Sequence, residues 1–137
     1  MFVLDTNVIS ELRRPKPHGA VVGWLQAQSN ASLCIAAITA GEVQSGIELT
    51  RKTDPEKAGE IERWLDELIS SIRVLDASAP IFRSWSRLMH GRPDHHWEDA
   101  LIAATALHHR MTIVSRNESD FRSLGVEVLN PFGYPGA

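Results

Sequence analysis

Four acidic residues stand at points of the sequence where a carboxylate could help to hold a metal ion. Asp5 ends an apolar run of strand-forming residues, and Glu42 lies just past a second such run. Asp99 begins a helical pattern, and Asp120 lies just past a later apolar run. If the runs are parallel strands, their carboxyl ends meet at one edge of the sheet, where ligands gather. The spacing therefore predicts that the four carboxylates converge.

Asp99 indicates most clearly that a cation is needed. At helical spacing it lines up with Ile102, Ala103 and Ala106, an apolar stripe that should pack against the core. An unpaired charge at the head of that stripe would be costly. An all-oxygen ligand set without cysteine suits Mg²⁺ or Mn²⁺ better than Zn²⁺. Crowded carboxylates without metal would hold protons through raised pKa values, so metal binding should weaken as pH falls.

Helix capping is the alternative explanation for three of these acids. Asp5 or Thr6 could simply cap a helix that begins near Val8. The other two acids could belong to capping boxes, as the pairs Thr39 with Glu42 and Asn117 with Asp120. The residue pattern leaves both explanations open.

The adjacent histidine pairs, His95–His96 and His108–His109, are poor chelates. Neighbouring residues point apart in a strand and lie about 100° apart on a helix. His96 and Trp97 could instead line the cleft, although Trp97 could equally belong to the core.

The composition fits one domain of 137 residues with a 43% apolar share. No segment approaches the roughly 20 apolar residues of a membrane span, and nothing at the start resembles an export signal, so we expect a soluble, cytoplasmic protein. Cys34 is the only cysteine and should be a buried thiol. A net charge of −3 argues against a generic basic coat for nucleic acid but allows local basic patches and a cationic partner.

Periodicity predicts a three-layer α/β/α sandwich around a central parallel sheet of about five strands. The predicted strands are 1–4, 33–38, 72–75, 112–115 and 126–129. Helical patterns fill the connections and include 8–14 and 98–109, a helix with Asp54 as N-cap, and a helix capped by Ser78. The tail, 130–137, is expected to be irregular.

Four sequence blocks, in order, resemble those of PIN-domain proteins, specifically the VapC-type toxin ribonucleases of bacterial toxin–antitoxin pairs. The blocks are Leu4 to Leu12, Thr39 to Glu42, Asp99 to Ala106, and Ser115 to Asn117 with Asp120 and Phe121. The closing residues Val128 to Phe132 also fit, so the resemblance runs from Val3 to about Phe132. It implies a single PIN domain over 1–137.

The resemblance implies that the acidic residues hold one or two Mg²⁺ or Mn²⁺ ions and catalyse hydrolysis of RNA phosphodiester bonds. Asp5 would be the central ligand, and Ser115 and Asn117 match the supporting polar positions, although the family commonly has Thr in place of Ser115. Glu98 beside Asp99 is a second carboxylate at the approach to the site; we favour Asp99 because it aligns with the apolar stripe. The resemblance also implies a homodimer and an antitoxin whose tail blocks the cleft.

An RNA strand approaching an acidic cleft would need cations at the rim. The candidates, each of which could instead be an ordinary solvated side chain, are Arg13, Arg14, Lys16, Arg51, Arg116 and Arg122.

Two other functions remain open. A strand-end aspartate also serves phosphotransferases and phosphatases that form an aspartyl-phosphate, but these usually have a second acid where Asn7 stands. A catalytically silent module that only holds RNA or a partner is the third possibility, and the complete set of four acids argues against it.

Overall fold

A parallel sheet with β1 at its centre organises the computed structural model, which describes residues 1–92 and 96–135. Every neighbouring pair of strands is parallel, and the order is β3-β2-β1-β4-β5. The strands are β1 (Phe2–Leu4), β2 (Leu33–Ala36), β3 (Arg73–Leu75), β4 (Thr112–Val114) and β5 (Val128–Leu129). The predicted sheet is thus confirmed, with shorter strands than the apolar runs suggested.

Alternation of side chains along the strands builds one core on each face of the sheet. Val3 and Cys34 face the core covered by α6 and α7, whereas Leu4 and Ile35 face the opposite core. All four side chains are essentially inaccessible to solvent. Burial on both faces explains why these runs are continuously apolar, as expected for central parallel strands. It also confirms the three-layer sandwich and the buried thiol.

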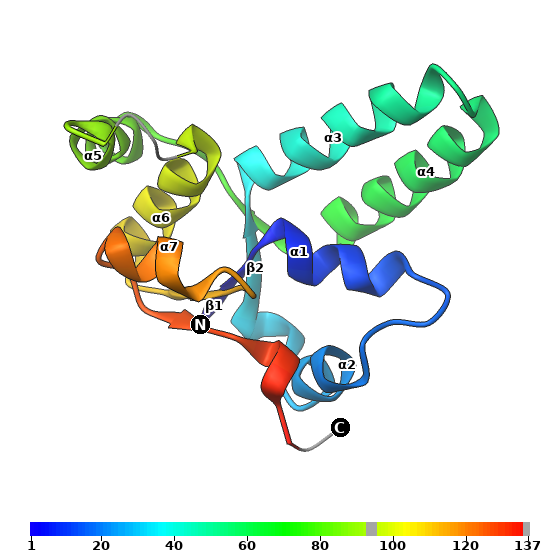
Figure 1. The fold of residues 1–137 in the computed structure, drawn as a ribbon, viewed down its shortest axis with the longest axis horizontal. Coiled ribbons are helices and arrows are strands. Elements are labelled where there is room, and N and C mark those ends of the chain that lie inside the picture. The colour runs from blue at the N-terminus through cyan, green and yellow to red at the C-terminus, as the bar shows by residue number, and fades with distance from the viewer. Residues whose placement is uncertain (93–95, 136–137) are drawn as a thin grey trace.

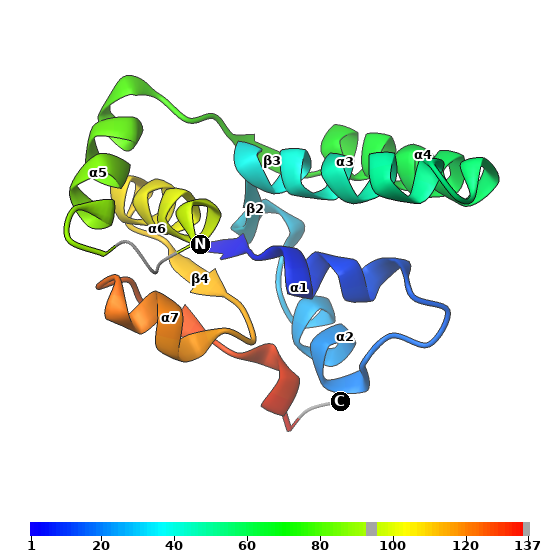
Figure 2. The same ribbon diagram turned by 45° about the horizontal axis from the view of Figure 1, so that its top comes forward.

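The helices lie on both sides of the sheet (Figure 1). They are α1 (Thr6–Ile9), α2 (Gly19–Gln26), α3 (Ala37–Arg51), α4 (Pro55–Ser71), α5 (Ala79–Met89), α6 (Trp97–His109) and α7 (Glu118–Ser123), with short 3₁₀ turns η1 (Ser10–Arg13), η2 (Asn30–Ser32) and η3 (Pro131–Gly133). Figure 2 shows α5, α6 and α7 gathered at one end of the molecule, away from the hairpin of α3 and α4. Within the described ranges, no helix has the length and apolar character that crossing a bilayer requires.

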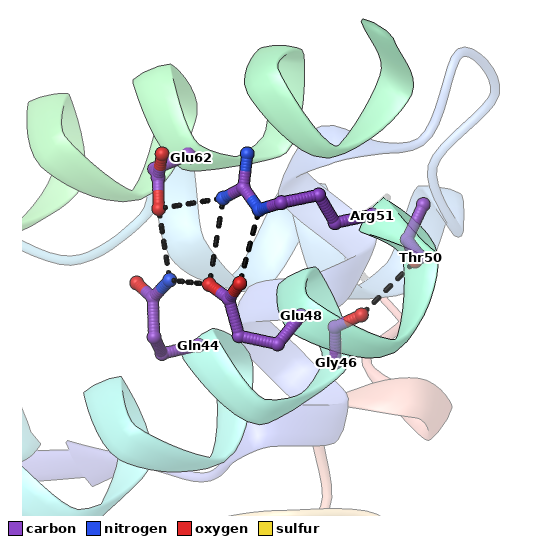
Figure 3. A network of polar contacts seen from close by, with 6 residues as sticks. All are labelled: Gln44, Gly46, Glu48, Thr50, Arg51 and Glu62. Atoms are coloured by element: carbon purple, nitrogen blue, oxygen red, sulfur yellow. Dashed lines mark hydrogen bonds and ion pairs between the residues drawn. The ribbon is translucent and has the colours of Figure 1, made fainter. Parts of the chain in front are cut away.

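A polar network joins α3 to α4 in the projecting hairpin (Figure 3). Arg51 donates to Glu48 at 3.0 Å and to Glu62 at 3.0 Å, and Gln44 donates to the same two carboxylates. As predicted, Asp54 caps α4 by accepting a hydrogen bond from the Lys57 backbone N–H. The network crosses from one helix to the other, so it adds polar contacts to the packing of Ile47 against Ala58 and Leu65.

Three local expectations were wrong. The first helix begins at Thr6 rather than near Val8, because Asp5 already caps it. β2 ends at Ala36 and α3 begins at Ala37, so Thr39 and Glu42 both lie inside the helix and form no capping box. The tail is not wholly irregular, because Asn130 caps the turn η3.

Candidate metal and nuclease site

Asp5 lies at the point where the order of the strands reverses. The chain builds the sheet outward from β1 through β2 to β3, then crosses to the other side of β1 to add β4. In open α/β sheets the crevice at such a point, beyond the carboxyl ends of the strands, is the usual ligand site. Asp5 follows β1 directly, and its backbone N–H donates to the Val114 carbonyl of β4 at 2.9 Å. The fold therefore places this carboxylate at the reversal.

Ser115, which follows β4, connects the polar residues around Asp5. Its hydroxyl donates to Asp5 Oδ2 at 2.7 Å and accepts from Asn7 Nδ2 at 3.2 Å and from the Asn117 backbone N–H at 2.9 Å. Asn7 also reaches Asp5 Oδ2 at 3.3 Å, and the Thr6 N–H donates to Oδ1 at 2.8 Å. Both oxygens of the buried Asp5 carboxylate are therefore held in place, and Asp5 is a helix cap and a site residue at once.

Glu42 reaches the same region from the second turn of α3. Its Oε1 accepts a hydrogen bond from the Thr6 hydroxyl at 3.1 Å, across 36 residues of sequence. Partial burial, together with the charges of Asp5, Asp99 and Glu98, raises the pKa of Glu42 to about 7, although the Thr6 hydrogen bond opposes the rise. Glu42 is thus a neighbour of three other acids rather than a capping residue.

Asp99, in the first turn of α6, completes the convergence with Asp120. Burial raises the pKa of Asp99 to about 6, with the charges of Asp5, Asp120 and Glu98 adding to the rise and that of His96 opposing it. Asp120 lies in α7, and the Asn117 side chain makes no capping hydrogen bond there. Asp5 and Asp99 therefore lie close enough to Glu42 to affect it, and Asp120 lies close enough to affect Asp99. Glu98 acts on both Glu42 and Asp99.

Among the described residues, the acidic group has no ion-paired cation. Within residues 1–92 and 96–135, no arginine, lysine or histidine forms an ion pair with any of the four acids. In the same part of the chain, no three acidic, histidine or cysteine side chains are already arranged as a metal-binding group. One turn before Glu42, the buried hydroxyl of Thr39 has no hydrogen-bond partner among the described residues. Oxygen ligands with uncompensated charge are the donor set that Mg²⁺ and Mn²⁺ prefer, so the residues fit such an ion.

The six candidate rim cations are not all at the site. Arg51 is bound in the hairpin network, nine residues and thus about 13 Å along α3 from Glu42. Arg122 pairs with Glu118 at 3.1 Å, and Arg14 pairs with Glu11 at 3.1 Å. Arg13 and Arg14 line a groove of about 620 Å³ with the start of α4, and Lys16 is exposed in the adjoining loop. Arg116 follows Ser115 directly.

The tryptophan and histidine candidates lie in different parts of the molecule. Trp97 is 46% exposed, so it is not a core residue, and it stands two positions before Asp99. His108 and His109 form an edge-to-face pair at the far end of α6, about 15 Å along the helix from Asp99. His95 lies outside the described residues. The bond of Thr6 to Glu42 and the bond of Asn7 to Ser115 were missed, and no local pattern in the sequence could have found them.

Comparison with known proteins now fixes the family. The model of the PIN domain matches residues 2–127. The chain belongs to the PIN-domain family. This PIN domain is 32% identical over 139 residues to toxin FitB of Neisseria gonorrhoeae, covering 96% of this chain and 99% of that protein. It is 33% identical over 138 residues to VapC ribonuclease Y4jK of Sinorhizobium fredii, with coverage of 96% and 98%.

The fold of this PIN domain agrees with a solved structure of such a toxin. The FitAB structure bound to the IR36 DNA fragment superposes with a TM-score of 0.83 at 31% identity, over 96% of both chains. Together these relatives identify this PIN domain as a VapC-type toxin, as the sequence blocks implied.

Proposed function

We propose that this PIN domain is a Mg²⁺- or Mn²⁺-dependent endoribonuclease and the toxin of a cytoplasmic toxin–antitoxin pair. The observation that carries the proposal is the set of four converging acids at the strand reversal, with no cation paired to them in the described part of the chain. The likeness to a VapC ribonuclease over nearly the whole chain supports RNA as the substrate.

Asp5, Glu42, Asp99 and Asp120 are the residues that would hold the ion. When bound, the ion lowers the pKa of a water and neutralises charge on the reacting phosphate. Ser115 and Asn7 orient the Asp5 carboxylate through hydrogen bonds, and Thr6 orients Glu42. Asn117 contributes its backbone N–H, which fixes the Ser115 hydroxyl. Because the pKa values of Glu42 and Asp99 are raised, protons on these two carboxyls would compete with an ion, so metal binding should weaken as pH falls.

The negative charge of the acidic site also indicates what kind of protein partner it binds. An antitoxin segment that carries an arginine could occupy the acidic site and supply the missing cation. The FitAB structure is a complex of such a toxin with its partner, which supports an antitoxin for this chain. We also propose that two copies of this chain form a homodimer.

The test is cleavage of a mixed RNA pool by antitoxin-free protein, with Mg²⁺, with Mn²⁺ and with EDTA. Asp5→Asn should abolish cleavage, because it removes the charge of the central ligand. Asp66→Asn, on the exposed face of α4, is the matched control and should cleave like the wild type. Circular dichroism checks that both variants fold.

Metal-dependent cleavage that is lost only in Asp5→Asn would establish the nuclease. Metal binding without cleavage of any RNA would favour the silent module, and a phosphorylated Asp5 detected by mass spectrometry would favour the phosphotransferase.

A further inference from the structure

The backbone of Arg116 is tied to the acidic site, and its exposed guanidinium forms no ion pair with a carboxylate in the described residues. Its backbone N–H donates to Asn7 Oδ1 at 3.2 Å, and Asn7 in turn donates to Asp5. Its guanidinium carbon lies 3.8 Å from the centroid of the Phe132 ring. The backbone is thus tied to the site, and the aromatic ring sets the direction of the side chain.

Phe132 is itself held from three sides. Its backbone N–H donates to Asn130 Oδ1 at 2.9 Å in the turn η3. The ring of His18 packs edge-on against it, with centroids 5.1 Å apart. Phe132 also packs on the core cluster that contains Leu4 and Val114, the last residues of β1 and β4. The ring is therefore a rigid support that rests on the strands carrying Asp5 and Ser115.

A guanidinium stacked on a ring keeps its N–H groups, which lie in its own plane, available for other partners. That plane matches two oxygens of a phosphate, so stacked arginines suit bidentate phosphate binding. Among the candidate rim arginines, Arg14, Arg51 and Arg122 are already paired with glutamates. Arg116 differs from them because its charge is uncompensated within the described chain and its orientation is fixed.

We infer that Arg116 binds a backbone phosphate of the RNA strand, and that Phe132 is the positioning residue that orients the guanidinium. This inference rests on the proposed ribonuclease function. It identifies one contact that holds the negatively charged RNA strand despite the acidic site. It also assigns a role to the C-terminal turn η3, which otherwise contributes nothing to the four acids.

The experiment measures binding of a fluorescein-labelled single-stranded RNA of mixed sequence by anisotropy, in EDTA to prevent cleavage, over a series of salt concentrations. Arg116→Ala should weaken binding about tenfold, since a charge-assisted bidentate contact is lost. Because each phosphate contact on a single strand contributes about 0.7 to the slope of log K against log salt, the slope should fall by about 0.7.

Two further variants separate charge from orientation. Arg116→Lys keeps the charge but not the planar fork, so the salt slope should stay while binding weakens about threefold. Phe132→Leu keeps an apolar side chain in the core but removes the ring face, and it should also weaken binding about threefold with little change in slope. Arg122→Ala is the matched control, because that arginine is paired with Glu118, and its binding should stay within about twofold of the wild type.

The outcomes distinguish this contact from the function it rests on. Suppose that the wild type binds and cleaves RNA, and that Arg116→Ala has the same RNA affinity and salt slope as Arg122→Ala. This result overturns the inference about Arg116 but leaves the proposed nuclease function standing. A lower kcat in Arg116→Ala with unchanged KM and Kd also overturns it, since the effect is then not on binding. Wild-type protein that neither binds nor cleaves RNA defeats both.

Discussion

The Ser115 hydroxyl uses its full hydrogen-bonding capacity at the reversal of the strands. It donates once, to Asp5, and accepts twice, from Asn7 and from the Asn117 backbone. Because Ser115 is completely buried, no solvent replaces these bonds if the oxygen is removed. A single oxygen atom thus connects β4 to the residues that follow β1.

Ser115→Ala should therefore lower the free energy of unfolding by about 2 kcal/mol, because buried donors lose their acceptor. RNA cleavage should fall as well, since the Asp5 carboxylate is no longer held. Ser115→Thr keeps the hydroxyl and should retain most of both properties. Urea denaturation and cleavage assays measure the two effects, and equal stability of Ser115→Ala and wild type would contradict the described bonds.

A second prediction concerns the pH dependence of stability without metal. The pKa of Glu42 is about 7 in the folded protein against an ordinary 4.5, so the folded state binds a proton that the unfolded state releases. The free energy of unfolding should then fall as pH rises from about 5 to about 8. Denaturation in EDTA across this range measures it. Adding Mg²⁺ at pH 8 should restore stability, by about 2.7 kcal/mol at 100 times Kd.

Glu42→Gln should flatten this pH dependence, because the amide does not titrate. Glu67→Gln, an exposed acid on α4, is the control and should leave the pH dependence of the wild type. If the free energy of unfolding of the wild type instead rises over this pH range, the prediction that neighbouring acids and burial raise the pKa of Glu42 is contradicted.

At the scale of elements, apolar runs predicted where strands lie, but not where they stop. The run after Ser32 continues to Ile38, yet β2 ends at Ala36, because Ala37 and Ile38 already belong to α3. Alanine and isoleucine are compatible with either conformation, so the boundary depends on packing with neighbours distant in the sequence. For the same reason, the expected pairing of Thr39 with Glu42 was wrong although the letters match a capping box.

The hairpin of α3 and α4 yields a prediction for Arg51. Replacing Arg51 and Glu62 by alanine, singly and together, should give a small favourable coupling energy, as for exposed ion pairs. The bonds of Glu62 to Gln44 and Arg51 lower its pKa below the ordinary 4.5. The coupling should therefore shrink only as pH falls through that lowered pKa, because protonation ends the attraction. RNA cleavage by the Arg51→Ala variant should be unchanged. A loss of RNA affinity in this variant would show that Arg51 contacts the RNA.

At the scale of the whole molecule, the sequence predicted the sheet and the four acids but not most of the contacts between them. The end of a strand can be recognised from the local sequence, so the positions of Asp5 and Asp120 could be predicted from the apolar runs that precede them. The bond of Thr6 to Glu42 and the stacking of Arg116 on Phe132 depend on the strand order, which no single segment encodes.

The exposed aromatic side chains of α5 and α6 lead to a prediction about assembly. Phe82 and Trp97 are each 46% exposed, and Trp85 donates its indole N–H to the Trp97 carbonyl at 3.0 Å, which holds the two helices together here. Sedimentation should give twice the 15.2 kDa mass of one chain, because a second copy would cover this apolar surface. Phe82→Glu should yield monomers. Leu49→Glu, on α3, is the control, and dimers that survive Phe82→Glu would contradict the prediction.

The pairing of β1 with β4 also sets the order in which a ribosome can produce a working site. Asp5 and Ser115 are 110 residues apart, so the acid leaves the ribosome long before its partner exists. At about 5–20 residues per second, synthesis of the intervening chain takes about 5–20 s. Until β4 emerges, β1 lacks the neighbour that completes the strand reversal, and a partly made toxin carries its central acid without an assembled site.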